Sequence, residues 1–355
     1  MTTDIMTDEV LFSVEKGLGL ITLNRPKALN SLTHTMAKAI LDQLGAWKSD
    51  AEVQAVVVRG AGEKAFCAGG DIVKIVKDYQ SGGLGWQDFF RDEYLMNIAI
   101  HDFPKPYISF VDGITMGGGV GVSIPGDFWV ATEKTLYAMP ETGIGFFPDV
   151  GGGWFLPRLP GAMGQYLGLT GARLKQEDLY ALGMASHVMV SEQVDDCIKA
   201  LGDADIRTNE DAKAILDQFH TDPAPAPIAA VMDDIDRIFD GFTVEDIIAA
   251  LEAQGGDWAD KQLKILRSKS PMALKVTFEQ LKRGAAIADF KSNMIMEYRM
   301  VVRWMAKGNF HEGVRALLID KDNAPVWQPA TLGAVSEDQV SAFFEPFAAA
   351  SDELL

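Results

Sequence analysis

Short apolar runs recur along the first part of the chain, and this pattern constrains the fold more than any other feature. Gln54–Arg59, Pro106–Val111 and Asp127–Ala131 are rich in Val, Ile and Phe and are bounded by turns or by helical stretches. Runs of this length and composition are typical of buried strands. Val10–Leu23 reads as two further strands around a glycine turn. The order strand, strand, helix, repeated without long loops, indicates an α/β arrangement.

The character of the sequence changes after about Val190, where helical patterns dominate. A Pro/Ala-rich stretch, Thr221–Pro227, is a stiff linker or a helix stop. A long helix is expected from about Ile287 to Met305. We therefore expect a core over residues 1–205 and a helical C-terminal region over residues 206–355.

The charge and the cysteine content exclude several classes of protein. The chain carries 50 acidic and 32 basic residues, a formal net charge of -18, which repels phosphate backbones and argues against a nucleic-acid partner. Its two cysteines, Cys67 and Cys197, form no disulfide framework. The N-terminal stretch Met1–Glu9 is acidic overall, and we see in it neither the basic nor the apolar segment of a signal peptide. No apolar run is long enough to span a membrane. These features predict a cytoplasmic protein with no membrane partner.

Motifs for several common chemistries are missing. The sequence contains no G-x-S-x-G nucleophile elbow, no phosphate-binding P-loop and no complete G-x-G-x-x-G dinucleotide motif. The five histidines show neither an H-E-x-x-H motif nor clustered spacing, so we expect no metal. Cys67 follows an apolar strand end and is better interpreted as a small buried thiol than as a nucleophile.

Two acids, Glu141 and Asp149, share one apolar, glycine-rich loop over Ala138–Gly153. A carboxylate that is kept from water has a raised pKa and becomes a usable acid or base near neutral pH. Acids are rarely buried without a reason, so both are candidate catalytic residues. Asp149 could instead be the N-cap of a helix that begins after Gly153, or it could sit on a turn.

Two glycine clusters, Gly69-Gly70 and Gly117-Gly118-Gly119, each lie where a strand ends and a helix begins. Glycine lets a ligand approach the backbone closely, so the N–H groups of these turns could converge on a carbonyl oxygen. The alternative is that the glycines only permit tight turns. Glu93, in an expected helix over Phe89–His101, would by itself be read as a solvated charge.

These residues resemble the crotonase (enoyl-CoA hydratase/isomerase) superfamily. The resemblance is carried in order by four segments, namely Leu23–Asn30, Ala65–Asp71, Gly113–Gly119 and Met139-Pro140-Glu141. Within the superfamily, the string Met139–Gly153, Phe155–Leu159 and the long helical tail resemble the 3-hydroxyisobutyryl-CoA hydrolase branch. The resemblance implies the crotonase fold, a right-handed spiral of ββα turns, over the core, followed by C-terminal helices.

The resemblance also implies roles for particular residues. Gly70 and Gly118 would form an oxyanion hole, Glu141 and Asp149 would be catalytic, and Glu93 would bind substrate. Further substrate-binding residues would come from the loops around Pro26 and Leu29 and around Ala68, Asp71 and Ile72.

Coenzyme A would be part of the substrate, so no separate cofactor is expected. Candidate cations for its phosphates are Arg25, Lys27 and Lys64. A homo-oligomer is one assembly that the resemblance suggests.

One departure from the family pattern favours hydrolysis. Hydratases of this superfamily pair two glutamates, and this chain has Gly121 at the position of the first. We therefore expect hydrolysis of a 3-hydroxyacyl-CoA thioester, in the first place 3-hydroxyisobutyryl-CoA, as in valine breakdown. An enoyl-CoA isomerase or hydratase of the same superfamily is the alternative, and a CoA-binding relative without activity is a third interpretation.

Overall fold

The computed structural model describes residues 7–349 and 352–355, and its chain divides into two compact units. Unit 1 comprises the chain up to Asp71, Arg91–Tyr137 and Leu174–Ala229. Unit 2 comprises Ile72–Phe90, Ala138–Arg173 and Ala230–Leu355. Each unit therefore joins segments that are far apart in sequence. The predicted division at residue 205 stays a prediction, and residues 1–6 of the acidic N-terminal stretch lie outside the described residues.

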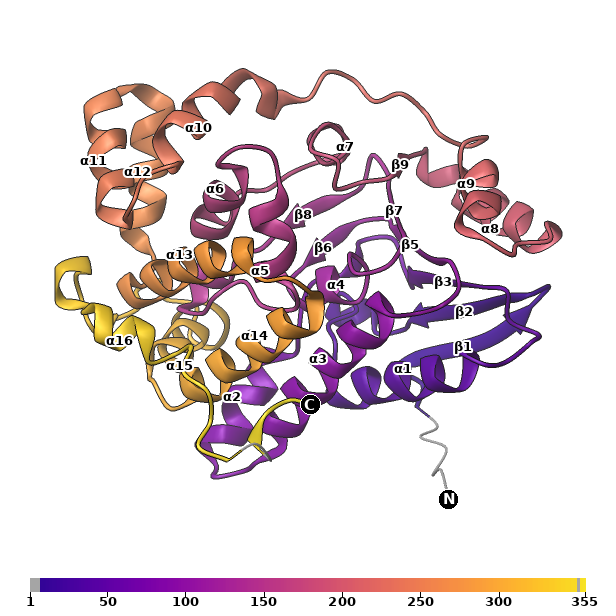
Figure 1. Cartoon of the computed structure of the whole chain (residues 1–355), viewed down its shortest axis with the longest axis horizontal. Coiled ribbons are helices and arrows are strands. Elements are labelled where there is room, and N and C mark those ends of the chain that lie inside the picture. The colour runs from indigo at the N-terminus through magenta and orange to yellow at the C-terminus, as the bar shows by residue number, and fades with distance from the viewer. Residues whose placement is uncertain (1–6, 350–351) are drawn as a thin grey trace. The chain divides into compact units, whose positions relative to one another are not determined.

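Unit 1 is built on two sheets of largely parallel strands (Figure 1). The larger sheet has the order β1-β2-β3-β5-β7-β9, and the smaller has the order β4-β6-β8. The pairs β3–β4, β5–β6 and β7–β8 each place their first strand in the larger sheet and their second in the smaller. The strands are β1 (Val10–Glu15), β2 (Leu18–Leu23), β3 (Ala55–Gly60), β4 (Ala65–Cys67), β5 (Tyr107–Val111), β6 (Ile114–Met116), β7 (Phe128–Ala131), β8 (Leu136–Ala138) and β9 (His187–Val188). This stepwise arrangement confirms the predicted α/β fold.

The strands form where the apolar runs predict them, because both faces of the larger sheet are covered. Val57 of β3 pairs with Ile108 of β5, and Ile108 pairs with Phe128 of β7. All three side chains belong to one buried cluster that also contains Leu201. Parallel strands that are buried on both faces read as continuous apolar runs, which explains the sequence pattern.

The hairpin β1–β2 turns at Lys16 and Gly17, which have φ of 50° and 82°. Two consecutive residues with positive φ are typical of the tight turns that match the twist of antiparallel strands.

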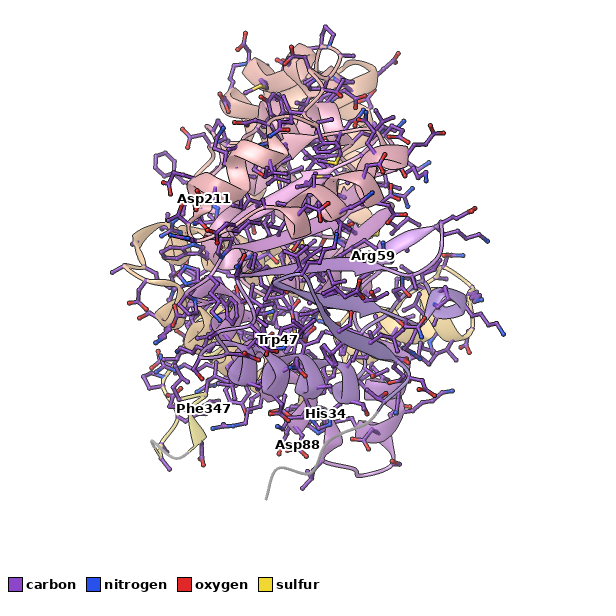
Figure 2. All side chains as sticks on the ribbon, turned by 90° about the vertical axis from the view of Figure 1, so that its right-hand side faces the viewer. His34, Trp47, Arg59, Asp88, Asp211 and Phe347 are labelled. Atoms are coloured by element: carbon purple, nitrogen blue, oxygen red, sulfur yellow. The ribbon has the colours of Figure 1, made fainter. Side chains whose placement is uncertain are left out.

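Helix α1 (His34–Trp47) begins after a side-chain N-cap, Thr33. The Thr33 hydroxyl accepts a hydrogen bond from Met36 N at 3.2 Å. Figure 2 labels the first and last residues of this helix, His34 and Trp47. The other unit 1 helices are α4 (Gly118–Gly121), α7 (Gln176–Ala181), α8 (Val194–Asp203) and α9 (Asn209–Leu216), and α3 (Gly85–His101) contributes residues to both units.

Unit 2 is helical, as the C-terminal sequence pattern predicts. Its helices are α2 (Ile72–Gln80), α5 (Gly152–Phe155), α6 (Met163–Thr170), α10 (Met232–Phe239), α11 (Val244–Gln254), α12 (Gly256–Ser268), α13 (Pro271–Ala286), α14 (Phe290–Met305), α15 (Asn309–Val314) and α16 (Glu337–Ser341). Helix α14 begins three residues later than expected, because the Asp289 side chain caps it by accepting from Ser292 N. Within the described residues, no helix has the length and hydropathy needed to cross a membrane.

Candidate active site

Unit 1 brings together the two glycines of the predicted oxyanion hole. Gly70 follows β4. The residues on either side of it form backbone hydrogen bonds with Leu32: Leu32 N donates to Gly69 O, and Asp71 N donates to Leu32 O. Gly118 is the first residue of α4, where a backbone N–H has no acceptor within the helix. Among the described residues, neither the Gly70 N–H nor the Gly118 N–H has a hydrogen-bond acceptor. Both donors remain available to a ligand.

The packing around Gly118 requires glycine. A methyl group built on Gly118 would lie 2.7 Å from Glu93 Oε1 and 3.3 Å from Gly70 N. One built on Gly119 would lie 2.1 Å from the carbonyl oxygen of Cys67. These short distances show that Gly70, Gly118 and Glu93 converge on one small space.

Glu93 is buried, with 2% of its surface exposed, and is not the solvated helix charge that the local sequence suggests. One turn later on α3, the buried side chain of Asn97 donates to Gly121 O at 2.9 Å. Helix α3 therefore presents polar groups to the glycine helix α4. Cys67 is a buried thiol, as predicted, and burial raises its pKa to about 12.

The predicted substrate loops lie on both sides of Gly70 in the chain. Pro26 begins a single 3-10 turn, and Leu29, with φ of 52°, accepts a hydrogen bond from Ala68 N at 3.0 Å.

Asp71 forms an ion pair with Arg25 at 3.1 Å. Arg25 also pairs with Glu9, so this candidate cation already has two partners within the protein. Ile72 begins α2 and belongs to unit 2, whereas the other four substrate-loop residues belong to unit 1.

Unit 2 brings together the two predicted catalytic acids. Glu141 begins a 3-10 turn over Glu141–Ile144, and Asp149 follows in the same loop. Each has only 6% of its surface exposed. The loop is fixed by Phe146 N, which donates to Glu141 O at 3.0 Å, and by Trp304 Nε1, which donates to Gly145 O at 2.8 Å.

The environment of Glu141 suits an acid–base or nucleophilic group. Burial raises its pKa well above the usual value, the charge of Asp149 raises it further, and the charge of Lys269 opposes both. Among the described residues, its Oε2 atom is buried without a hydrogen-bond partner. A buried carboxylate oxygen without a donor is costly, and such groups concentrate at functional sites.

The alternative reading of Asp149 as a helix N-cap is wrong. Helix α5 begins at Gly152 with Gly151 as its N-cap, and no side chain caps it. Asp149 instead lies at the start of a turn, where its backbone carbonyl accepts from Gly152 N at 2.8 Å. Its carboxylate is therefore not committed to capping the helix.

Sequence reasoning missed two charged residues near this pair, Glu297 and Lys269. Glu297 lies on α14 and is fully buried, and its charge raises the pKa of Glu141. Burial lowers the pKa of Lys269 to about 8, and a methyl group built on Gly143 would lie 3.1 Å from Lys269 Nζ. A signal for Glu297 was present, because Asn293 and Glu297 are polar residues spaced by one turn on the otherwise largely apolar buried face of α14.

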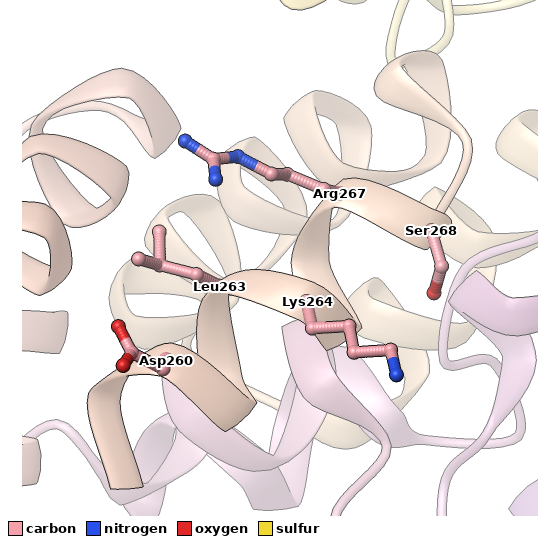
Figure 3. Close-up of a pocket in the computed structure, with 5 residues that line it drawn as sticks. All are labelled: Asp260, Leu263, Lys264, Arg267 and Ser268. Carbon is pink, nitrogen blue, oxygen red and sulfur yellow. The ribbon is translucent and has the colours of Figure 1, made fainter. Parts of the chain in front are cut away.

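A further cavity in unit 2, of about 490 Å³, contains none of the predicted site residues (Figure 3). It lies along α12 and is lined by Asp260, Leu263, Lys264, Arg267 and Ser268. In the described part of the chain, no group of three His, Cys, Asp or Glu residues is arranged to hold a metal ion.

Comparison with known proteins identifies the family to which this sequence is similar. Residues 18–344 match the family described as enoyl-CoA hydratase/isomerase. A 3-hydroxyisobutyryl-CoA hydrolase, mitochondrial, from Danio rerio is 48% identical over 341 residues, which cover 95% of this chain and 89% of the relative. The protein of the same name from Homo sapiens is 44% identical over 343 residues, with the same two coverages.

Two solved structures are similar over nearly the whole chain. A carnitinyl-CoA dehydratase from Mycobacterium thermoresistibile has a TM-score of 0.91 and 41% identity, covering 98% of this chain and 99% of that chain. An enoyl-CoA hydratase from Rhodobacter sphaeroides has a TM-score of 0.90 and 38% identity, with the same coverages. These likenesses confirm the predicted crotonase-like fold with its C-terminal helices.

The expected cytoplasmic location is wrong according to these relatives, which are named mitochondrial. The expectation depended partly on two cysteines without a disulfide pattern, and this feature indicates a reducing compartment without specifying which one.

Proposed function

Because the chain belongs to the enoyl-CoA hydratase/isomerase family, we propose that it hydrolyses a 3-hydroxyacyl-CoA thioester. The substrate is 3-hydroxyisobutyryl-CoA, and the products are 3-hydroxyisobutyrate and free coenzyme A. The names of the curated relatives support this reaction. The observation that carries it is the buried pair Glu141 and Asp149, in a chain that has glycine at position 121.

The two unpaired backbone donors are suited to the thioester oxygen. In the proposed reaction, the Gly70 and Gly118 N–H groups bind this oxygen and stabilise the negative charge that develops on it. One donor of this kind contributes about 3 kcal/mol to lowering the barrier. Glu93, whose carboxylate lies against Gly118, accepts the hydrogen bond of the substrate's 3-hydroxyl group. A site that binds a hydroxyl group in this way rejects acyl groups without it.

Glu141 supplies the attack on the carbonyl carbon by one of two routes. In the first, a Glu141 carboxylate oxygen bonds to the carbonyl carbon, the C–S bond breaks, and water then hydrolyses the resulting anhydride. In the second, Glu141 removes a proton from a water molecule, whose oxygen forms the new bond. In both routes the sulfur leaves as a thiolate and is protonated. Asp149 orients the water or the 3-hydroxyl group and assists this proton transfer.

Position 121 argues against hydration. Adding water to a double bond in this superfamily uses two glutamates, one to activate the water and one to protonate the α-carbon. This chain has Glu141 for the second position and no acid at Gly121. The hydratase and dehydratase names of the two similar structures are therefore no guide to the reaction here.

Thiol release tests the proposal. The protein is incubated separately with 3-hydroxyisobutyryl-CoA and with a 3-enoyl-CoA in the presence of a thiol reagent. Free thiol from the first substrate alone is the expected result. Conjugation of the second substrate without thiol release would favour the isomerase, which needs only the acid at Glu141. Coenzyme A binding without turnover of any acyl-CoA would favour a relative that has lost its activity.

Two wider assignments belong to the same proposal. The reaction would serve valine breakdown, since 3-hydroxyisobutyryl-CoA is the proposed substrate. The chain, of 38.7 kDa, would form a homo-oligomer, as the resemblance suggests. Light scattering after size-exclusion chromatography measures the assembly directly, and a mass of one chain would contradict the oligomer.

A further inference from the structure

Glu297 binds both ends of the short turn Gly151–Gly153. Gly151 N donates to its Oε2 atom at 2.8 Å, and Gly153 N donates to its Oε1 atom at 2.8 Å. Asn293 Nδ2 and Gln280 Nε2 also donate to Oε1, at 2.9 and 3.3 Å. All four partners are donors to this fully buried side chain, so together they fix the position of its two oxygens.

The turn that Glu297 holds begins two residues after Asp149, and Val150, the residue between them, has an unfavourable backbone. Val150 has φ of 49° and Gly151 has φ of 95°. The left-handed region is strained for a β-branched residue and persists only where the surroundings enforce it. On the other side of Asp149, Gln280 Nε2 donates to Pro148 O at 2.7 Å. Side chains of α13 and α14 therefore hold the backbone on both flanks of Asp149.

The backbone of the turn packs closely against this cluster. A methyl group built on Gly153 would lie 2.6 Å from Asn293 Oδ1 and 3.1 Å from Glu297 Oε1. One built on Gly284 of α13 would lie 1.8 Å from Gly153 O. Helix α5, which contains Gly153, packs against both α13 and α14 (Figure 1).

We propose that Glu297 is a positioning residue, which fixes the turn after Asp149 and so sets the place of the Asp149 carboxylate relative to Glu141. It acts through Asp149 and through the backbone. This inference rests on the proposed hydrolase function, because it gives Glu297 a part in the same reaction.

Glu297 adds negative charge to the acid pair only where it is ionised. Burial raises its pKa to about 8, and the charge of Asp149 acts in the same direction. In the described structure, the charged groups that act on Glu141 are Asp149, Lys269 and Glu297, and of these only Lys269 lowers its pKa.

Two variants weaken the hold of Glu297 on the turn in different ways. Glu297→Asp keeps the charge, but its shorter side chain cannot reach both N–H groups. Glu297→Gln keeps the length, but its amide NH₂ group faces one of the two donors. The matched control is Glu279→Gln on α13, which removes a partly exposed carboxylate that is paired with Arg283. Thermal unfolding establishes that each variant is folded before kinetics are measured.

Both Glu297 variants should lower kcat at least tenfold while KM stays within about threefold, since misplacing a catalytic group by 1 Å costs roughly a hundredfold. Wild-type kcat in both variants would overturn the inference, as would an equal loss in Glu279→Gln.

Hydrogen exchange of the Gly151 and Gly153 amides gives a readout that is independent of turnover. Exchange should be faster in both Glu297 variants than in wild type and in the Glu279→Gln control. Unchanged exchange would overturn the inference. A wild-type protein that releases no thiol, yet shows the expected exchange, would contradict the proposed reaction and leave the positioning of the turn intact.

Discussion

At the scale of single residues, Glu141 combines a raised pKa with an unpartnered oxygen. Replacing it by glutamine removes both the nucleophilic and the acid–base role while preserving shape. We expect Glu141→Gln to lower kcat for thioester cleavage at least a hundredfold, the scale of a lost acid–base group. Initial rates of thiol release measure this. Cleavage at the wild-type rate by the folded variant would mean that another group carries the reaction.

The raised pKa of Glu141 also has a consequence for stability. Folded Glu141 keeps its proton at pH values where the unfolded residue, with a pKa of 4.5, has lost it. The wild type therefore loses stability as pH rises above about 4.5, whereas a glutamine does not titrate. We expect Glu141→Gln to be more stable than wild type by on the order of 1 kcal/mol or more at pH 7, and by less near pH 4.5. Urea unfolding across this range measures the difference, and a difference independent of pH would contradict the burial of an ionisable Glu141.

Lys269 opposes the burial of Glu141, because its positive charge favours the ionised carboxylate. Lys269→Met should raise the pKa of Glu141 further and move the acid limb of kcat/KM to higher pH. A shift of one pH unit would lower activity up to about tenfold below the midpoint. Lys264→Met on α12 removes an exposed charge and serves as the control. An acid limb that moves to lower pH, or equally in both variants, would refute this electrostatic role.

At the scale of elements, α4 depends on glycine for a tight approach to its neighbours. The methyl group of Gly118→Ala would crowd both Glu93 Oε1 and Gly70 N. We expect this variant to lose at least tenfold in kcat, because the donor is displaced but kept, whereas removing such a donor costs about a hundredfold or more.

Gly45→Ala on α1 is the matched control, since nothing lies within 4 Å of its added methyl group. It should keep wild-type activity and gain roughly 0.5–1 kcal/mol of stability from the better helix propensity of alanine. Steady-state kinetics and urea unfolding of both variants test this contrast. Wild-type kcat in Gly118→Ala would show that the space beside Glu93 is not used in the reaction.

The elements also show which features a sequence can predict. The turn at Lys16-Gly17, the cap at Thr33 and the loop that carries Glu141 and Asp149 depend on neighbouring residues, and each follows from local pattern. Glu297 lies 146 residues from Gly151 and 144 residues from Gly153, so no local pattern reports its contacts. Asn293 and Glu297 show only that one face of α14 buries polar groups. What that face binds is decided by tertiary packing.

At the scale of the whole molecule, the dominant property is the net charge of -18. Like charges repel one another more strongly in the compact state than in the extended chain, so this excess destabilises the fold at low ionic strength. Dissolved salt screens the repulsion, with a screening length of about 10 Å at 0.1 M. The many ion pairs on the surface act in the opposite direction, but exposed pairs contribute little.

We therefore expect the melting temperature at pH 7 to rise by a few degrees between about 0.02 M and about 0.2 M sodium chloride, equivalent to roughly 1 kcal/mol. Differential scanning calorimetry measures the shift. The control is the same comparison near the isoelectric point of about 4.7, where the net charge vanishes and the salt effect should vanish with it. A melting temperature that falls with salt at pH 7 would show that attractive ion pairs outweigh the repulsion of the excess acids.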